Sequence, residues 1–170
     1  LVQLVARLYA ELPQPLVLDA DALTALAAVP AVWTRHAGAR ILTPHPGEFR
    51  RLAGSLASTR AEQEAQACDW ARSAGVVLVL KGSGTLVTDG RRVYRNSTGN
   101  PGLATGGSGD VLTGLITALV CQGLAPFEAA QLGVYLHGRA GDLGAAARGE
   151  VSLIASDLLG FLPDAIQGYQ

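Results

Sequence analysis

The chain is organised around the stretch Asn96-Ser-Thr-Gly-Asn-Pro-Gly-Leu-Ala-Thr-Gly-Gly-Ser-Gly-Asp110, in which five residues are glycine. Apolar residues at helical spacing follow Asp110, so the sequence predicts a helix over 111–122. A glycine-rich loop that leads into a helix N-terminus presents unpaired backbone N–H groups, which suit an anion such as phosphate. A flexible loop is the alternative. Because glycine loses the most entropy on folding, a run this dense favours close approach to a ligand.

Short apolar segments alternate with helical patterns around this stretch. The sequence predicts strands over 16–19, 40–43 and 76–80, and a hairpin over 85–95 whose Asp89-Gly90 pair favours a type I′ turn. It predicts helices over 1–12, 22–27, 46–53, 60–74, 127–146 and 156–167, with Asp21 and Ser58 or Thr59 as N-caps. The segment 76–80 is apolar throughout, which indicates a strand buried on both faces. We therefore expect an α/β sandwich with a mainly parallel sheet and an antiparallel hairpin.

Composition limits the classes of protein that fit. The 170 residues are 49% hydrophobic and 16% charged, which fits one globular domain with a sizeable core. The formal net charge of −1 gives no basic field for nucleic acid or a membrane surface. Cys68 and Cys121 lack metal-ligand spacing, so we expect buried, reduced thiols in a cytoplasmic protein. The chain has no methionine and opens inside a helical pattern, so we expect it to be N-terminally incomplete.

Polar residues follow three of the expected strands. They are Asp19, the segment 43–45 and Lys81. In open parallel sheets ligands bind beyond the carboxyl ends of the strands, so these groups are expected on one rim with the glycine-rich loop. The two prolines around His45 restrict its backbone and would fix the direction of a substrate-binding imidazole.

Each of these residues also has a purely structural interpretation. Asp19 could be a turn residue, and the segment around His45 could be a tight connection. Glu48 could complement a helix N-terminus, and Lys81 could be a solvated residue after a strand. His36 and His137 are expected to be structural.

Standard phosphate motifs do not account for the glycine-rich loop. A Walker A loop needs Gly-Lys-Ser/Thr, but no lysine follows Gly109, and a dinucleotide fingerprint begun at Gly107 would need glycine where Leu112 stands. The loop would therefore bind an anion through its backbone, with Asp110 as the chemical group at its end. A phosphate cradle beside a carboxylate suggests phosphoryl transfer to a hydroxyl, with Asp110 accepting the proton late in the reaction.

Five segments together resemble a known family. Ala104-Thr-Gly-Gly-Ser-Gly-Asp-Val-Leu-Thr-Gly114 resembles the signature of the ribokinase-like superfamily. Asp19-Ala-Asp-Ala-Leu23, Thr43-Pro-His-Pro-Gly-Glu48, Lys81-Gly-Ser-Gly-Thr85 and Asn96-Ser-Thr-Gly-Asn100 resemble, more narrowly, the ADP/ATP-dependent NAD(P)H-hydrate dehydratases. The resemblance implies a ribokinase-like three-layer sandwich. It also implies that residues 1–170 are the C-terminal portion of one such domain, whose upstream part is absent.

The resemblance further implies a repair enzyme. It would use ADP or ATP with Mg²⁺ to phosphorylate the hydroxyl of the S form of hydrated NADH or NADPH, and would then eliminate phosphate. Asp110 would be the catalytic acid and would contact the hydrate together with His45. The nucleotide-binding residues would be Lys81, Gly82, Ser83, Gly84, Thr85, Gly107, Ser108 and Gly109. No residue is expected to be a metal ligand. The resemblance also implies a homo-oligomer and an upstream fused NAD(P)H-hydrate epimerase domain.

Two alternatives remain open from the sequence. One is a kinase of the same superfamily that acts on a vitamin-precursor alcohol of the hydroxymethylpyrimidine or hydroxyethylthiazole type. The other is a catalytically incompetent fragment that binds nucleotide. The segment 43–48 favours the dehydratase over the kinase.

Overall fold

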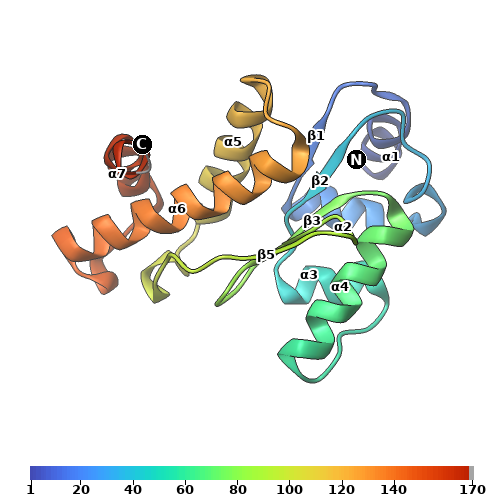
Figure 1. Cartoon of the computed structure of the whole chain (residues 1–170). Coiled ribbons are helices and arrows are strands. Elements are labelled where there is room, and N and C mark those ends of the chain that lie inside the picture. The colour runs from blue at the N-terminus through green and yellow to red at the C-terminus, as the bar shows by residue number, and fades with distance from the viewer. Residues whose placement is uncertain (169–170) are drawn as a thin grey trace.

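The computed structural model describes residues 1–168 and contains one five-stranded sheet with helices on both faces (Figure 1). The strands lie in the order β1 (Leu16–Leu18), β2 (Arg40–Leu42), β3 (Val77–Leu80), β4 (Leu86–Thr88) and β5 (Val93–Arg95). β1, β2 and β3 pair in parallel, whereas β4 is antiparallel to both of its neighbours. β5 therefore runs in the same direction as the first three strands. The predicted, mainly parallel sheet with an antiparallel hairpin is confirmed.

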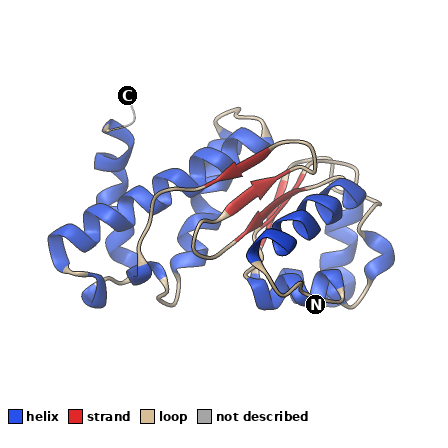
Figure 2. Ribbon diagram, turned by 60° about the horizontal axis from the view of Figure 1, so that its bottom comes forward, coloured by secondary structure: helices blue, strands red, loops and turns tan. Residues whose placement is uncertain are grey.

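The two faces of the sheet pack against different helices. One face is covered by α1 (Val2–Glu11), α2 (Ala20–Ala27), α3 (Pro46–Ala53) and α4 (Arg60–Ala74), and the other by α5 (Ser108–Cys121) and α6 (Pro126–Arg148). On β3, Leu78 and Leu80 join the first core while Val77 and Val79 join the second. This alternation explains why the strand is apolar at every position. The three layers are visible in Figure 2, which shows helices on both sides of the strands.

The last helix packs beyond the sheet. α7 (Ala155–Gln167) lies against α6, where Ala165 joins Leu136 and Ala140 in a small separate core (Figure 1). Three 3₁₀ turns, η1 (Pro30–Val32), η2 (Pro101–Leu103) and η3 (Glu150–Ser152), connect the larger elements. None of the helices within residues 1–168 has both the length and the apolar character needed to cross a membrane.

Local sequence signals explain several helix ends. Thr59, one of the two predicted N-caps, caps α4, and Glu62 completes a capping box. Gly75 ends α4 with a left-handed φ of 68°. Pro46 begins α3, where its missing N–H costs nothing.

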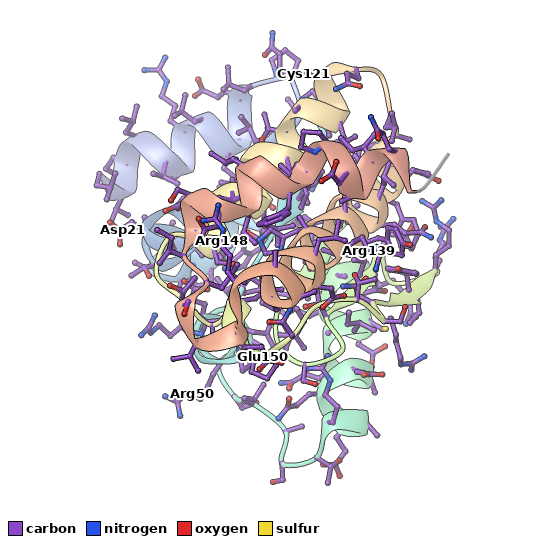
Figure 3. All side chains as sticks on the ribbon, turned by 90° about the vertical axis from the view of Figure 1, so that its left-hand side faces the viewer. Asp21, Arg50, Cys121, Arg139, Arg148 and Glu150 are labelled. Atoms are coloured by element: carbon purple, nitrogen blue, oxygen red, sulfur yellow. The ribbon has the colours of Figure 1, made fainter. Side chains whose placement is uncertain are left out.

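Some local expectations are wrong. Asp19, not Asp21, occupies the N-cap position of α2, because the helix begins at Ala20. α5 begins at Ser108, three residues before the predicted start at 111, so Asp110 lies inside its first turn. Cys121 is exposed and Cys68 is half-buried, so the thiols are not both buried. Figure 3 shows Asp21 and Cys121 at the periphery of the molecule.

The hairpin turn also differs from the prediction. Thr88 pairs with Val93, which leaves four residues in the loop. Gly90 has a φ of 83°, but Asp89 is not in the left-handed region that a type I′ turn requires. The Asp89 carboxylate instead accepts hydrogen bonds from the backbone N–H groups of Arg91 and Arg92 and so stabilises the loop.

Candidate active site

The ends of the three parallel strands meet at one rim, as the sequence predicted. Asp19 follows β1 and Lys81 follows β3, and the Lys81 Nζ donates to Asp19 Oδ1 over 2.8 Å. The segment after β2 lies between them, because the Lys81 backbone N–H donates to the carbonyl of Pro44 over 2.9 Å. The side chains of Lys81 and Asp19 are 21% and 10% exposed, so solvent screens their attraction only in part.

The backbone beside Asp19 is strained. Ala20 has a φ of 46°, a left-handed conformation that is uncommon for a residue with a Cβ. Strain of this kind persists only where the surrounding structure imposes it. Here the Asp19 carboxylate is held by Lys81 and also accepts from the Thr113 hydroxyl of α5 over 3.3 Å. Asp19 therefore ties the end of β1 to β3 and to α5.

The N-terminus of α5 lies at the same rim. Gly107 turns the chain into the helix with a φ of 86°, which glycine adopts readily. The first backbone N–H with an acceptor four residues earlier is that of Val111, which donates to Gly107. The N–H groups of Gly109 and Asp110 precede it and have no intrahelical partner. A Cβ on Gly109 would lie 3.2 Å from Asp19 Oδ2 and 3.4 Å from Lys81 Nζ, so these donors lie beside the ion pair of Lys81 and Asp19.

A cleft of about 710 Å³ opens at this rim. Of the predicted site residues, the following line it: His45, Lys81, Gly82, Ser83, Gly84, Thr85, Ser108 and Gly109. Gly107 and Asp110 do not line it. Both lie exposed next to Ser108 and Gly109, which line the cleft, and Asp110 is the third residue of the helix.

His45 has a structural role as well as a place in the cleft wall. Its Nδ1 accepts hydrogen bonds from the backbone N–H groups of Gly47 and Glu48 and caps α3. The His45 backbone N–H donates to Glu48 Oε2 over 2.8 Å, which completes a capping box. Because Nδ1 is an acceptor, the ring proton lies on Nε2. Nε2 lies 3.6 Å from Glu48 Oε1, and the ring is half-exposed in the cleft wall.

Two groups of contacts that the sequence did not predict hold the cleft walls. Arg60 of α4 donates to the carbonyl of Gly84 over 2.7 Å and so supports the loop after β3. On the opposite wall, Thr98 donates to the carbonyl of Tyr135 over 2.8 Å. The side chain of Asp142 accepts from the Gly99 backbone N–H over 2.9 Å. Arg60 of α4 and residues of α6 therefore hold the loops of the cleft walls in place, although the sequences of these loops do not indicate it.

His137 of α6 was expected to be structural, yet it lines the cleft. Its Nε2 lies 3.0 Å from the carbonyl oxygen of Ser108 and 3.2 Å from the Ser108 hydroxyl. Burial lowers the pKa of His137, and the nearby charge of Lys81 lowers it further, against the opposing effect of the Ser108 hydrogen bond. A lone histidine in an apolar helix gives no signal of this contact in the sequence. His36, by contrast, bonds to two backbone carbonyls, as a structural residue would.

Known proteins with similar sequences show which family the chain belongs to. A sequence model of the NAD(P)H-hydrate dehydratase family matches residues 2–163. The chain belongs to this family. It is similar to a bifunctional NAD(P)H-hydrate repair enzyme from Moorella thermoacetica, with 49% identity over 99% of this chain and 32% of the relative.

Solved structures agree with the family and with the ribokinase-like fold. An ADP/ATP-dependent NAD(P)H-hydrate dehydratase from Bacillus subtilis, co-crystallised with ATP and Mg²⁺, superimposes with a TM-score of 0.82 and 34% identity. The match covers 95% of this chain and 57% of that one. A ribokinase-like superfamily protein from Enterococcus faecalis gives a TM-score of 0.79 and 28% identity, over 99% of this chain and 58% of its own. The chain thus spans about a third of the curated relative and just over half of these structures.

Proposed function

We propose that this chain forms the nucleotide and hydrate site of an ADP- or ATP-dependent dehydratase that restores NADH or NADPH from the S form of its hydrate. The observation that carries the proposal is the convergence of Lys81, the α5 N-terminus and His45 on one cleft. A cation and free backbone N–H groups favour phosphate. A half-exposed imidazole N–H in the wall of the same cleft favours a hydroxyl or amide of the second substrate.

The nucleotide would lie along the loop after β3, with its phosphates toward α5. In this proposal it contacts Lys81, Gly82, Ser83, Gly84, Thr85, Gly107, Ser108 and Gly109. His45 and Asp110 would contact the hydrate. The Asp110 carboxylate is exposed in the first turn of α5 and makes no hydrogen bond or ion pair within residues 1–168, so it is free to accept a proton from the hydrate.

The reaction would proceed in two steps. With ADP, the hydroxyl oxygen of the hydrate attacks the β-phosphorus, the bond from that phosphorus to the bridging oxygen breaks, and AMP leaves. Asp110 accepts the hydroxyl proton as the bond to phosphorus forms. The carbon–oxygen bond then breaks with loss of orthophosphate and of a proton from the neighbouring carbon, which restores the double bond of NADH. The role of the protein is to position the reactants and to stabilise phosphate charge.

Mg²⁺ would enter with the nucleotide. In the part of the chain that the structure describes, no three His, Cys, Asp or Glu side chains gather as a metal cage. Mg²⁺ is commonly held by substrate phosphates, water and one or two carboxylates. The bound ion would neutralise phosphate charge.

The proposal is tested by incubating the chain with hydrated NADH, Mg²⁺ and ADP or ATP, and by following the return of NADH absorbance. We expect one AMP and one orthophosphate for each NADH recovered with ADP. Phosphorylation of a hydroxymethylpyrimidine or hydroxyethylthiazole, without NADH recovery, would favour the related kinases. Nucleotide binding without either reaction would indicate a binding fragment.

The proposal also includes the rest of the protein to which this chain belongs. We infer that residues 1–170 are the C-terminal portion of one ribokinase-like domain, preceded in the whole protein by the rest of that domain. The bifunctional name of the Moorella relative supports a fused epimerase domain. We further propose a cytoplasmic homo-oligomer. Size-exclusion chromatography of the whole protein would test the oligomer.

A further inference from the structure

We propose that His137 is a positioning residue that directs the hydroxyl proton of Ser108 into the cleft, so that Ser108 donates a hydrogen bond to phosphate. The inference rests on the proposed function, because it places a phosphate group at the N-terminus of α5. It goes beyond that function by assigning a role to a buried histidine of another helix.

The contact between the two residues is enclosed. Ser108 is the first residue of α5 and is 5% exposed, and His137 lies in the middle of α6 and is 8% exposed. Both line the cleft beside Lys81 and Gly109. A single ring nitrogen, His137 Nε2, lies within hydrogen-bond distance of both oxygens of Ser108.

The chemistry of the two oxygens decides where the protons lie. The carbonyl of Ser108 only accepts hydrogen bonds, so His137 Nε2 must carry a proton to bond to it over 3.0 Å. A protonated Nε2 cannot accept, so the Ser108 hydroxyl oxygen, 3.2 Å away, is on the accepting side of its contact with His137. The hydroxyl proton of Ser108 must therefore point elsewhere, and Ser108 makes no other side-chain hydrogen bond within the described part of the chain.

His137 also limits what the hydroxyl can do instead. A serine hydroxyl in a helix often donates to a backbone carbonyl three or four residues earlier, which would consume its proton. The N–H of His137 instead holds the hydroxyl oxygen from α6. Because burial and Lys81 lower its pKa, the ring is neutral at neutral pH, with Nδ1 as the unprotonated nitrogen. The hydroxyl proton is then the donor left for a ligand near Lys81.

The test measures binding of three ligands to the chain by calorimetry: ADP, inorganic pyrophosphate and adenosine. Ser108→Ala removes the donor, and His137→Leu removes the group that directs it. His137→Gln keeps an N–H at a similar distance and serves as the matched control. We expect Ser108→Ala and His137→Leu each to weaken ADP and pyrophosphate about tenfold, as the loss of one charge-assisted hydrogen bond implies.

The adenosine titration separates positioning from a general structural effect. Adenosine has no phosphate, so its affinity should stay within about twofold in every variant. His137→Gln should bind ADP within about threefold of wild type, and the double variant Ser108→Ala/His137→Leu should be no weaker than Ser108→Ala alone. Circular dichroism checks that the variants fold. If His137→Leu does not fold, Ser108→Ala and His137→Gln still give opposite predicted outcomes.

Several outcomes overturn the inference. It fails if Ser108→Ala binds ADP and pyrophosphate as wild type does, or if adenosine weakens in parallel with ADP. It also fails if wild type binds neither phosphate ligand. Binding of pyrophosphate that depends on Ser108 and His137, in a chain that never restores NADH, would support the inference while the proposed reaction fails.

Discussion

Replacing Gly109 by alanine should weaken ADP binding and leave the free energy of unfolding nearly unchanged. Gly109 is the second residue of α5, and an added Cβ would lie 3.2 Å from Asp19 Oδ2 and 3.4 Å from Lys81 Nζ. The methyl group would thus stand between the helix N-terminus and the cation, where we place a phosphate oxygen. The substitution leaves every charged side chain in place.

The two effects have different magnitudes. Alanine is favoured over glycine inside helices by about 1 kcal/mol, and the tight contact with Asp19 offsets part of that gain. The free energy of unfolding should therefore change by less than about 1 kcal/mol. Exclusion of a phosphate oxygen from Lys81 removes a charge-assisted hydrogen bond of about 1.5–3 kcal/mol, so ADP affinity should fall about 10- to 100-fold.

Gly114→Ala is the matched control. Gly114 lies in the same helix, and an added Cβ meets nothing within 4 Å. This variant should gain up to about 1 kcal/mol of stability and bind ADP as wild type does. Urea denaturation and calorimetric titration measure the two quantities. ADP affinity that is unchanged in Gly109→Ala would refute the placement of phosphate beside α5.

Two further predictions concern the histidines. His45→Ala should lower stability by about 1 kcal/mol in urea denaturation through loss of the α3 cap, whereas His45→Asn should keep the cap. Both should raise KM for the hydrate, and an unchanged KM in His45→Asn would remove His45 from the substrate site. For His137, whose pKa is lowered by burial, the unfolded chain binds the proton first, so the free energy of unfolding falls as the pH drops below about 6.5. The contribution of the neutral ring is lost in full below the folded-state pKa. Urea denaturation from about pH 7 to 5 should show a shallower decline in His137→Gln, and equal declines would contradict a buried neutral ring.

The arrangement of the site followed from the sequence to the extent that local patterns encode it. Polar residues after parallel strands predicted the meeting of Asp19 and Lys81, and prolines predicted the extended backbone of His45, observed at φ −77° and ψ 166°. Long-range side-chain contacts carried no such signal. Arg40, for example, is buried in β2 and donates to carbonyls at the end of α1, including that of Tyr9. Its position in an apolar strand segment did not indicate this bond.

The place of His137 shows the same limit. Its neighbours in sequence belong to the apolar face of α6, and its partner Ser108 is 29 residues away. Only the packing of α5 against α6 brings them together. The start of α5 was missed for a related reason: the glycines around Ser108 disfavour a helix locally, and tertiary packing overrides that preference.

AMP formation measured together with NADH recovery tests the proposed phosphoryl transfer. In that reaction the nucleotide phosphoryl group would pass to the hydrate beside α5 while Asp110 accepts the proton. Wild type with ADP and hydrated NADH should form AMP and NADH in equal amounts, and Asp110→Asn should form neither while it still binds ADP. Recovery of NADH without AMP, or turnover by Asp110→Asn at the wild-type rate, would contradict the proposed reaction.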